Sequence, residues 1–154
     1  DCMSRNVRQR AIRAGYRSGI EQDISEQLKE RKIEAEYEPF KIPYTMPESY
    51  HTYTPDFVMG NGIVLESKGR FLHADRKKHC LIREQYPDLD LRFVFSNSRS
   101  RLRKGSKTTY AIWCEKNGFS YADKIVPVEW LKEKTNKKSL KIINQIIGEK
   151  WWPT

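Results

Sequence analysis

Long hydrophobic runs are missing from this sequence of 154 residues, which nowhere holds the roughly 18 consecutive apolar residues of a membrane-spanning helix. No transmembrane segment is therefore expected. The first twenty residues also lack the apolar stretch of a secretory signal, so we expect a cytoplasmic protein. Their arginine-rich character is compatible with a transit peptide or with a DNA-contacting arm, and we favour the arm.

Cysteine and histidine are scarce. The three cysteines are odd in number and far apart, which argues against both a disulfide framework and a zinc site. The three histidines show no metalloprotease spacing, and we interpret them as structural or DNA-facing. The residues concerned are Cys2, Cys80, Cys114, His51, His73 and His79.

Acidic residues are outnumbered, with 20 Asp and Glu against 29 Lys and Arg, for a net charge of +9. This excess indicates a polyanionic partner, with nucleic acid as the first candidate and an anionic membrane surface as the second. A hydrophobic content of 38% and an aromatic content of 12% suffice for a core, and the length suggests one domain.

A predicted β-hairpin occupies residues 54–69, where two apolar runs flank Gly-Asn-Gly. A two-residue turn would set Asp56 opposite Ser67. A three-residue loop over residues 60–62 would instead set Asp56 opposite Glu66. We predict the three-residue loop, because such a loop favours a glycine in the left-handed conformation and residues 60–62 contain two glycines.

This register gathers Asp56, Glu66 and Lys68 on one face of the hairpin, since successive strand residues alternate between faces. Carboxylate oxygens suit Mg²⁺ or Mn²⁺, and a nearby lysine can orient or deprotonate a water. The alternative is a surface hairpin with an ordinary Glu–Lys pair. The opposite face is predicted to be core: Phe57, Met59, Ile63 and Leu65.

A helix is predicted from Ser18 to about Arg31, because Ser18 and Glu21 form a capping box. Ile20, Ile24 and Leu28 make its predicted buried stripe. Glu21 borders that stripe. It either caps the helix and does nothing else, or it caps the helix and also faces a functional site.

Residues 33–37 alternate as a half-buried strand does. Residues 39–47 follow, with prolines at 39, 43 and 47 that forbid a helix and keep the chain extended. We expect this stretch to have no hairpin partner of its own. It is either a surface connection or a bridge to another subunit.

The remaining elements alternate between helix and strand, which predicts an α/β core with a mixed sheet. A strand after a crossover helix favours parallel pairing. The expected elements are a helix capped by Asp75 and running over 76–86, a strand at 91–95, a helix at 109–116, a strand near 119–126, a short helix from Pro127 to Trp130, and an amphipathic helix at 139–147. We divide the chain into a basic arm (1–15), a main domain (16–134) and a basic, amphipathic tail (135–154).

Basic residues cluster in the arm, around the helix after Asp75 and in the loop at 98–107, where they suit phosphate contacts. Cations at the start of a helix are disfavoured by its dipole, so a nearby phosphate would explain residues 76–78; a solvated face is the alternative. The candidate DNA-binding residues are Arg13, Arg17, Arg70, Arg76, Lys77, Lys78, Arg99, Arg101, Arg103, Lys104 and Lys107.

The sequence Pro55-Asp56 followed by Glu66-Ser67-Lys68 resembles the motif of the PD-(D/E)xK nuclease superfamily. The wider pattern is similar to the endonuclease I family of T-seven-type phages, which resolve Holliday junctions. The similarity covers about residues 16–133 and is carried by residues 16–21, 52–57, 61–63, 66–69, 75–79, 81–85, 95–96, 98–99, 104–106, 114–116 and 122–124.

The resemblance implies a restriction-endonuclease-like fold and a site for two Mg²⁺ or Mn²⁺ ions. The side chains of Glu21, Asp56 and Glu66 and the carbonyl of Ser67 would bind metal, and Lys68 would assist the attacking water. It also implies an intertwined homodimer in which an exchanged N-terminal element brings Glu21 into the twin chain's site, with residues 39–47 as the bridge.

The implied reaction is hydrolysis of four-way and other branched DNA junctions to 5′-phosphate and 3′-hydroxyl ends, in the cytoplasm of a phage-infected host. Two alternatives stay open. One is a restriction- or homing-type endonuclease acting on linear duplex DNA. The other is a non-catalytic protein that binds junctions.

Overall fold

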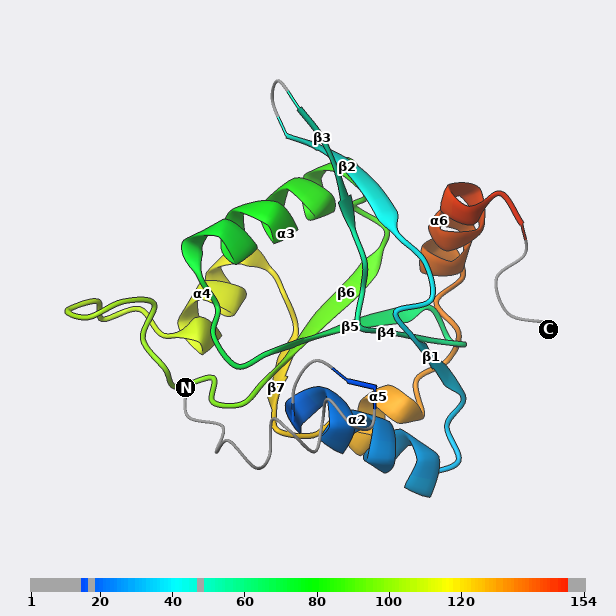
Figure 1. Ribbon diagram of the computed structural model, residues 1–154, viewed down its shortest axis with the longest axis horizontal. Helices are drawn as coiled ribbons and strands as arrows, with labels where there is room; N and C mark the ends of the chain where they lie inside the picture. Colours follow the sequence, from blue (N-terminus) through cyan, green and yellow to red (C-terminus); the bar gives the residue numbers. More distant parts are fainter. Residues whose placement is uncertain (1–14, 17–18, 47–48, 150–154) are drawn as a thin grey trace.

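A five-stranded mixed sheet forms the centre of the computed structural model, which describes residues 15–16, 19–46 and 49–149. The strand order is β1-β4-β5-β6-β7 (Figure 1). The first three strands pair antiparallel, and β5, β6 and β7 pair parallel, so the predicted mixed sheet is confirmed. The strands are β1 (Ala35–Tyr37), β4 (Phe57–Met59), β5 (Ile63–Lys68), β6 (Asp90–Phe95) and β7 (Tyr121–Asp123).

The β4–β5 hairpin has the predicted three-residue loop. Phe57 pairs with Leu65, and Val58 pairs with Val64. Gly62 closes the loop in the left-handed conformation, at φ 90°, where glycine is unstrained. This register sets the direction of every side chain near the open end of the hairpin.

Helix α2 (Gly19–Glu30) covers one face of the sheet. Two residues of its predicted stripe, Ile24 and Leu28, are buried, and the third, Ile20, is partly buried against the same cluster. The side-chain amide of Gln27 holds the segment before helix α5 (Val128–Leu131) by accepting from the N–H of Val126 at 2.9 Å and donating to its carbonyl at 2.7 Å. The predicted core face of the hairpin is confirmed, since its members pack with α2: Phe57, Met59, Ile63 and Leu65.

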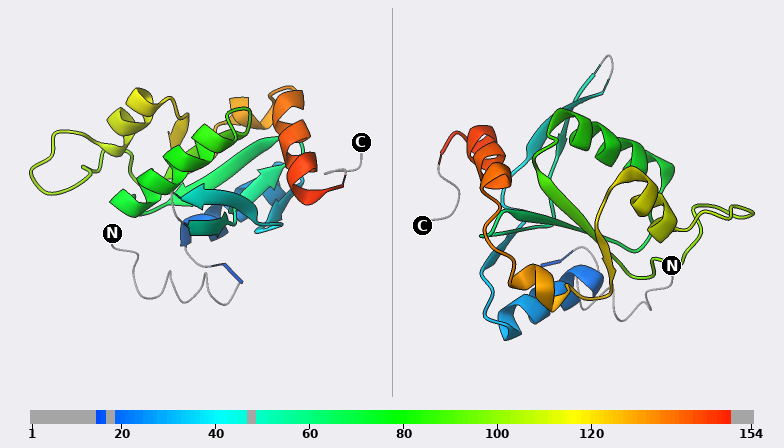
Figure 2. Two further views of the ribbon diagram at one scale, coloured as in Figure 1. Left: turned by 90° about the horizontal axis from the view of Figure 1, so that it is seen from above. Right: turned by 180° about the vertical axis from the view of Figure 1, so that it is seen from behind.

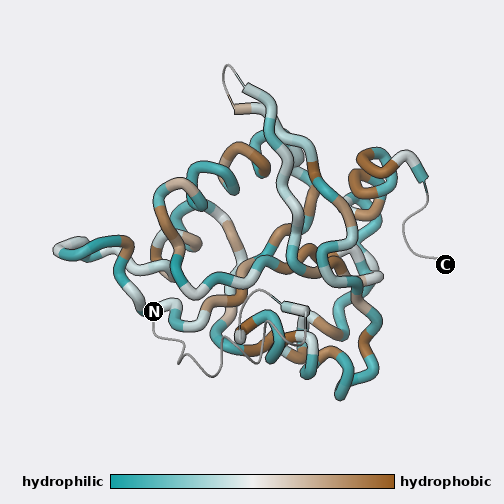
Figure 3. The backbone as a smooth tube through the Cα atoms, in the orientation of Figure 1, coloured by the Kyte–Doolittle hydropathy of each residue, from teal (hydrophilic) through white to brown (hydrophobic). Residues whose placement is uncertain are grey.

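The other face of the sheet is also buried, beneath helices α3 (His73–Gln85), α4 (Tyr110–Asn117) and α6 (Lys137–Ile147). Val58 and Val64 point into this second cluster. Apolar segments accordingly run through the middle of the molecule in Figure 3, and Figure 2 shows the helices around the strands. Interpretation of the hairpin as a surface element is therefore wrong.

Helix α3 begins three residues earlier than predicted. Its N-cap is Leu72, and Asp75 stands at the third helical position, where its carboxylate accepts from the Leu72 N–H at 3.0 Å. Asp75 is thus not the N-cap. Because the helix starts at His73, the basic residues 76–78 lie beyond its first three positions and the dipole disfavours them less than the sequence suggested.

The proline-rich stretch does have a hairpin partner, contrary to prediction. Strand β2 (Ile42–Met46) pairs antiparallel with β3 (Ser49–Tyr53) in a ribbon that projects past α3 (Figure 1). Pro43 is tolerated because a two-stranded ribbon leaves one side of each strand unpaired. The partner strand escaped notice because its first four residues are exposed and show no hydrophobic alternation.

Helix α6 holds the turn of the central hairpin. The hydroxyl of Ser139 donates to the Gly62 carbonyl at 2.6 Å, and the Asn136 N–H donates to the Asn61 carbonyl at 2.8 Å. Ile143 is fully buried in the core. The predicted C-terminal tail therefore packs, through α6, against the β4–β5 hairpin.

Expectations for residues 1–14, Arg17, Ser18 and 150–154 fall outside the described residues. Within the described ones, no helix is both long enough and apolar enough to cross a bilayer.

Candidate functional site

Four carboxylates and two ammonium groups surround a cavity of about 330 Å³ at the open end of the β4–β5 hairpin. The hairpin supplies Asp56, Glu66 and Lys68, as its register requires. The sequence-predicted residues are therefore brought together. The lining consists of Glu21, Glu38, Thr52, Tyr53, Thr54, Asp56, Glu66, Ser67, Lys68 and Lys78.

Asp56 is locked to the neighbouring strand by Ser67. Both the N–H and the hydroxyl of Ser67 donate to Oδ2 of Asp56, at 2.9 and 2.8 Å. The N–H of Asp56 in turn donates to Oε1 of Glu66 at 3.4 Å. The two carboxyls are thus fixed side by side at the end of the hairpin.

Glu66 is buried, and its two oxygens meet different partners. The hydroxyl of Tyr53 donates to Oε1 at 2.6 Å. The Lys68 ammonium lies 3.5 Å from Oε2. Burial raises the pKa of Glu66, although Lys68 and the Tyr53 hydrogen bond both act to lower it.

Lys68 bridges two acids, since its Nζ lies 3.5 Å from Glu66 and 3.3 Å from Oδ1 of Asp75. Burial acts to lower the pKa of Lys68, but Glu66 and Asp75 outweigh burial and the pKa is raised. The side chain is therefore a cation at neutral pH. Asp75 therefore contacts the N-cap backbone with Oδ2 and positions this ammonium with Oδ1.

Glu21 and Glu38 complete the cavity from the opposite side. Carboxylate oxygens of Glu21, Glu38 and Asp56 all lie within 4.8 Å of one another. Glu21 is only 6% exposed and accepts a hydrogen bond from the Tyr37 hydroxyl. It therefore faces the site as well as standing in the first turn of α2, so capping alone does not describe it.

Glu38 is a site residue that the sequence analysis does not predict. It follows β1, and its N–H donates to the Asp56 carbonyl at 2.9 Å, with φ at 45°. This approach depends on the pairing of Tyr37 with Phe57, which is a contact between distant parts of the chain. An acid directly after an edge strand was the one local signal available.

Crowding of the acids shifts their protonation. Burial and then the nearby Glu66 and Glu21 raise the pKa of Asp56 to about 8, although the two Ser67 hydrogen bonds act against the shift. A carboxyl in such surroundings ionises readily only when a cation offsets the repulsion. Clustered carboxylate oxygens match the preferences of Mg²⁺ and Mn²⁺, so the residues fit such ions.

Of the predicted DNA-binding residues, one lines this cavity and five are exposed on a projecting loop. Lys78 lines the cavity and lies over the Tyr53 ring, 5.4 Å from its centroid. Arg76 instead donates to the Phe71 carbonyl at 2.5 Å, while Arg70 and Lys77 are exposed. Five others are exposed on the loop between β6 and α4, which projects in Figure 1: Arg99, Arg101, Arg103, Lys104 and Lys107. Arg13 and Arg17 lie outside the described residues.

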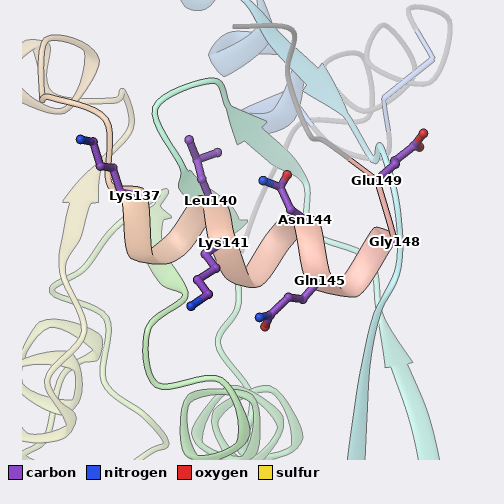
Figure 4. Close-up of a pocket in the computed structure, with 7 residues that line it drawn as sticks. All are labelled: Lys137, Leu140, Lys141, Asn144, Gln145, Gly148 and Glu149. Carbon is purple, nitrogen blue, oxygen red and sulfur yellow. The ribbon is translucent and has the colours of Figure 1, made fainter.

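A separate groove of about 600 Å³ follows helix α6 (Figure 4). Its lining holds Lys137, Lys141 and a single acid, Glu149, and includes none of the four clustered carboxylates. The chemistry is therefore concentrated at the hairpin.

Comparison with known proteins agrees with these features. The family model described as phage endonuclease I matches residues 3–150. Endonuclease I of Escherichia phage T7 is 56% identical over 118 residues, covering 77% of this chain and 79% of that protein. Endodeoxyribonuclease 1 of Enterobacteria phage T3 is also 56% identical over 118 residues, covering 77% of this chain and 78% of its own length.

Proposed function

Since the chain belongs to the phage endonuclease I family, we propose that it is a metal-dependent endonuclease that cleaves branched DNA, four-way junctions above all. The observation that carries this proposal is the meeting of Glu21, Asp56, Glu66 and Lys68 in one cavity. These residues come from three separated stretches of the sequence. Their convergence is also what a PD-(D/E)xK nuclease core needs.

Glu21, Asp56, Glu66 and the carbonyl of Ser67 would hold Mg²⁺ or Mn²⁺. The chemistry that divalent cations supply in such sites is an acidified water and a counter-charge for the leaving oxygen. In the hydrolysis, the oxygen of a water forms the new bond to phosphorus and gives up a proton to the solvent, and the bond from phosphorus to the 3′ oxygen breaks. The 3′ oxygen takes up a proton, which leaves a 5′-phosphate and a 3′-hydroxyl.

Lys68 would act as a cation rather than as a base, because Glu66 and Asp75 keep it protonated. An ammonium at this position can donate to the attacking water or to a phosphate oxygen. Either contact aligns the nucleophile with the phosphorus and stabilises the charge that develops there.

Binding of a branched substrate would depend on charge and shape. The net charge of +9 and the projecting arginine-rich loop favour contacts with phosphates, which carry no direct sequence information. Selectivity for a junction would then come from the angle between DNA arms.

We further propose that two chains exchange their N-terminal elements. Opening the ribbon between Met46 and Ser49 would let each β2 pair with the β3 of a second chain, in the register that the pairs of Ile42 with Tyr53 and Met46 with Ser49 define. Residues 19–46 would then carry Glu21 and Glu38 to the twin's Asp56. Two such sites in a symmetric dimer suit paired cuts across a junction.

The deciding experiment compares cleavage of a four-way junction with cleavage of its component duplexes. We expect cleavage of the junction in Mg²⁺ or Mn²⁺, slower cleavage of the duplexes, and none in EDTA. Labelled strands give the chemistry of the new ends.

Equal rates on junction and linear duplex would instead support a restriction-type enzyme. Tight junction binding without cleavage in any divalent metal would support a non-catalytic binding protein.

A further inference from the structure

His79 is buried without a hydrogen bond. Its side chain lies on the inner face of α3 and is 0% exposed, and neither ring nitrogen has a hydrogen-bond partner within the described part of the chain. Buried polar groups are nearly always paired, and one left unpaired costs stability that an apolar residue would not. The presence of an imidazole here therefore needs a reason other than packing.

The ring is held in a fixed orientation. Tyr53 and Phe93 both meet it edge-on, with centroids 5.1 and 4.9 Å away and planes at 88°. Burial, and then the nearby Lys78 and Lys68, lower the pKa of His79 well below its usual value. The imidazole is therefore neutral and carries one N–H, which can be on either nitrogen.

Nε2 of His79 lies 4.0 Å from Oε2 of Glu66, one of the proposed metal ligands. The two oxygens of Glu66 are held unequally. Oε1 accepts from the Tyr53 hydroxyl and from the Asp56 N–H. Oε2 has only the Lys68 ammonium at 3.5 Å, among the residues that the structure describes.

Lys68 has a second task if the proposed function is right. A turn of its ammonium toward the water or the phosphate would take it away from Glu66, and Oε2 would then lose its cation. A shift of about 1 Å would bring Nε2 of His79 within hydrogen-bond distance of that oxygen.

We propose that His79 is a positioning residue, which donates from Nε2 to Oε2 of Glu66 when Lys68 turns toward the substrate. This inference rests on the proposed nuclease function and adds a residue that acts only through Glu66. The Glu66 carboxylate would then keep its orientation toward the metal while Lys68 contacts the water or the phosphate.

The test uses two variants of equal side-chain length, His79→Gln and His79→Met. Gln keeps an N–H donor near the position of Nε2, and Met fills a similar volume without one. We expect His79→Met to lower kcat for junction cleavage at least about tenfold, because a hydrogen bond to a charged group is lost. The KM for the junction should change less than about twofold, since no DNA contact is altered.

His79→Gln should keep kcat within about threefold of the wild type. Melting temperatures in EDTA separate the proposal from a packing role. Met removes a buried unpaired group, so His79→Met should be at least as stable as the wild type. Loss of activity without loss of stability, rescued by Gln, is the expected pattern.

Wild-type kcat in His79→Met would overturn the proposal, and so would equal losses in both variants. ¹⁵N-histidine NMR of the wild-type protein in Mg²⁺ gives an answer independent of folding of the variants. The expected form of His79 is neutral with the proton on Nε2, and a proton on Nδ1 would overturn the assignment. Failure of the wild type to cleave junctions would refute the nuclease proposal itself. The NMR and melting data do not depend on that proposal.

Discussion

The backbone N–H of Asp56 donates to the side chain of Glu66 at 3.4 Å, which holds two buried carboxyls together at the end of one hairpin. In the absence of a cation this arrangement is costly when both acids are ionised. The pKa of Asp56 at about 8 expresses that cost. The same contact therefore links metal binding, pH and stability.

We expect the metal-free protein to lose stability as the pH rises from about 4 to about 8. The pKa of Asp56 is raised from 3.8 to about 8 on folding, so the folded state binds more protons than the unfolded state in this window. Asp56→Asn stays neutral and should raise the melting temperature in EDTA by about 3 °C or more near pH 8.5, with a smaller gain near pH 5. Calorimetry at several pH values measures this.

The exposed Asp23 supplies the control, because Asp23→Asn on α2 should show no such pH-dependent gain. Mg²⁺ should stabilise the wild type at pH 8 and leave Asp56→Asn nearly unchanged. An equal response of both proteins to Mg²⁺ would contradict Asp56 as a ligand.

Glu66→Ala and Lys68→Ala should each reduce junction cleavage at least about 10³-fold, because each removes a group at the reacting centre. Junction binding should survive, since neither residue is exposed enough to provide much of the DNA contact. Gel shifts in EDTA and single-turnover cleavage in Mg²⁺ separate the two effects. Lys116→Ala, exposed on α4, controls for loss of positive charge. Near wild-type cleavage by either site variant would refute the assignment.

Local patterns predicted the part of the site that lies on one hairpin. The Gly-Asn-Gly loop and the alternation of strand side chains were enough to bring Asp56, Glu66 and Lys68 to one place. Burial of the opposite face followed from the same alternation. Helix α3 begins three residues before its predicted start because its N-cap is Leu72, which has no polar side chain to signal a start.

Local sequence patterns do not predict contacts between distant segments of the chain. Glu38 reaches the site only because β1 pairs with β4, and the ribbon partner of β2 has no alternating pattern. The hold of Ser139 on Gly62 spans 77 residues. No period of 2 or 3.6 residues encodes these pairings, and they depend on how the whole chain packs.

Glu38→Gln should raise the Mg²⁺ concentration for half-maximal cleavage by about tenfold, since acids beside metal ligands tune affinity. The rate at saturating Mg²⁺ should stay near that of the wild type, because Glu66 and Lys68 are untouched. Gln has the same shape, so the φ of 45° costs the same in both proteins. Glu36→Gln, exposed on β1 two residues earlier, is the matched control. Identical Mg²⁺ curves for Glu38→Gln and the control would show that Glu38 is outside the metal site.

Removal of Arg101 and Arg103 together should weaken junction binding and its dependence on salt. Both are exposed on the loop between β6 and α4. Each lost phosphate contact should reduce the slope of log affinity against log salt by about 0.9. The cleavage rate of bound junction should not change. Lys29→Ala combined with Lys116→Ala removes the same charge from other exposed positions, and an equal change of slope there would refute a specific role for the loop.

Complementation between two inactive variants tests the exchange of N-terminal elements. Glu21→Gln and Asp56→Asn should each be inactive as homodimers. In an exchanged heterodimer, the Asp56 of the first chain meets the Glu21 of the second, so one site is intact and the other carries both substitutions. Co-expression should therefore restore nicking of junctions, with about a quarter of the wild-type number of sites if the chains assemble at random. Without exchange every site keeps one substitution, and an inactive, co-expressed dimer would rule the exchange out.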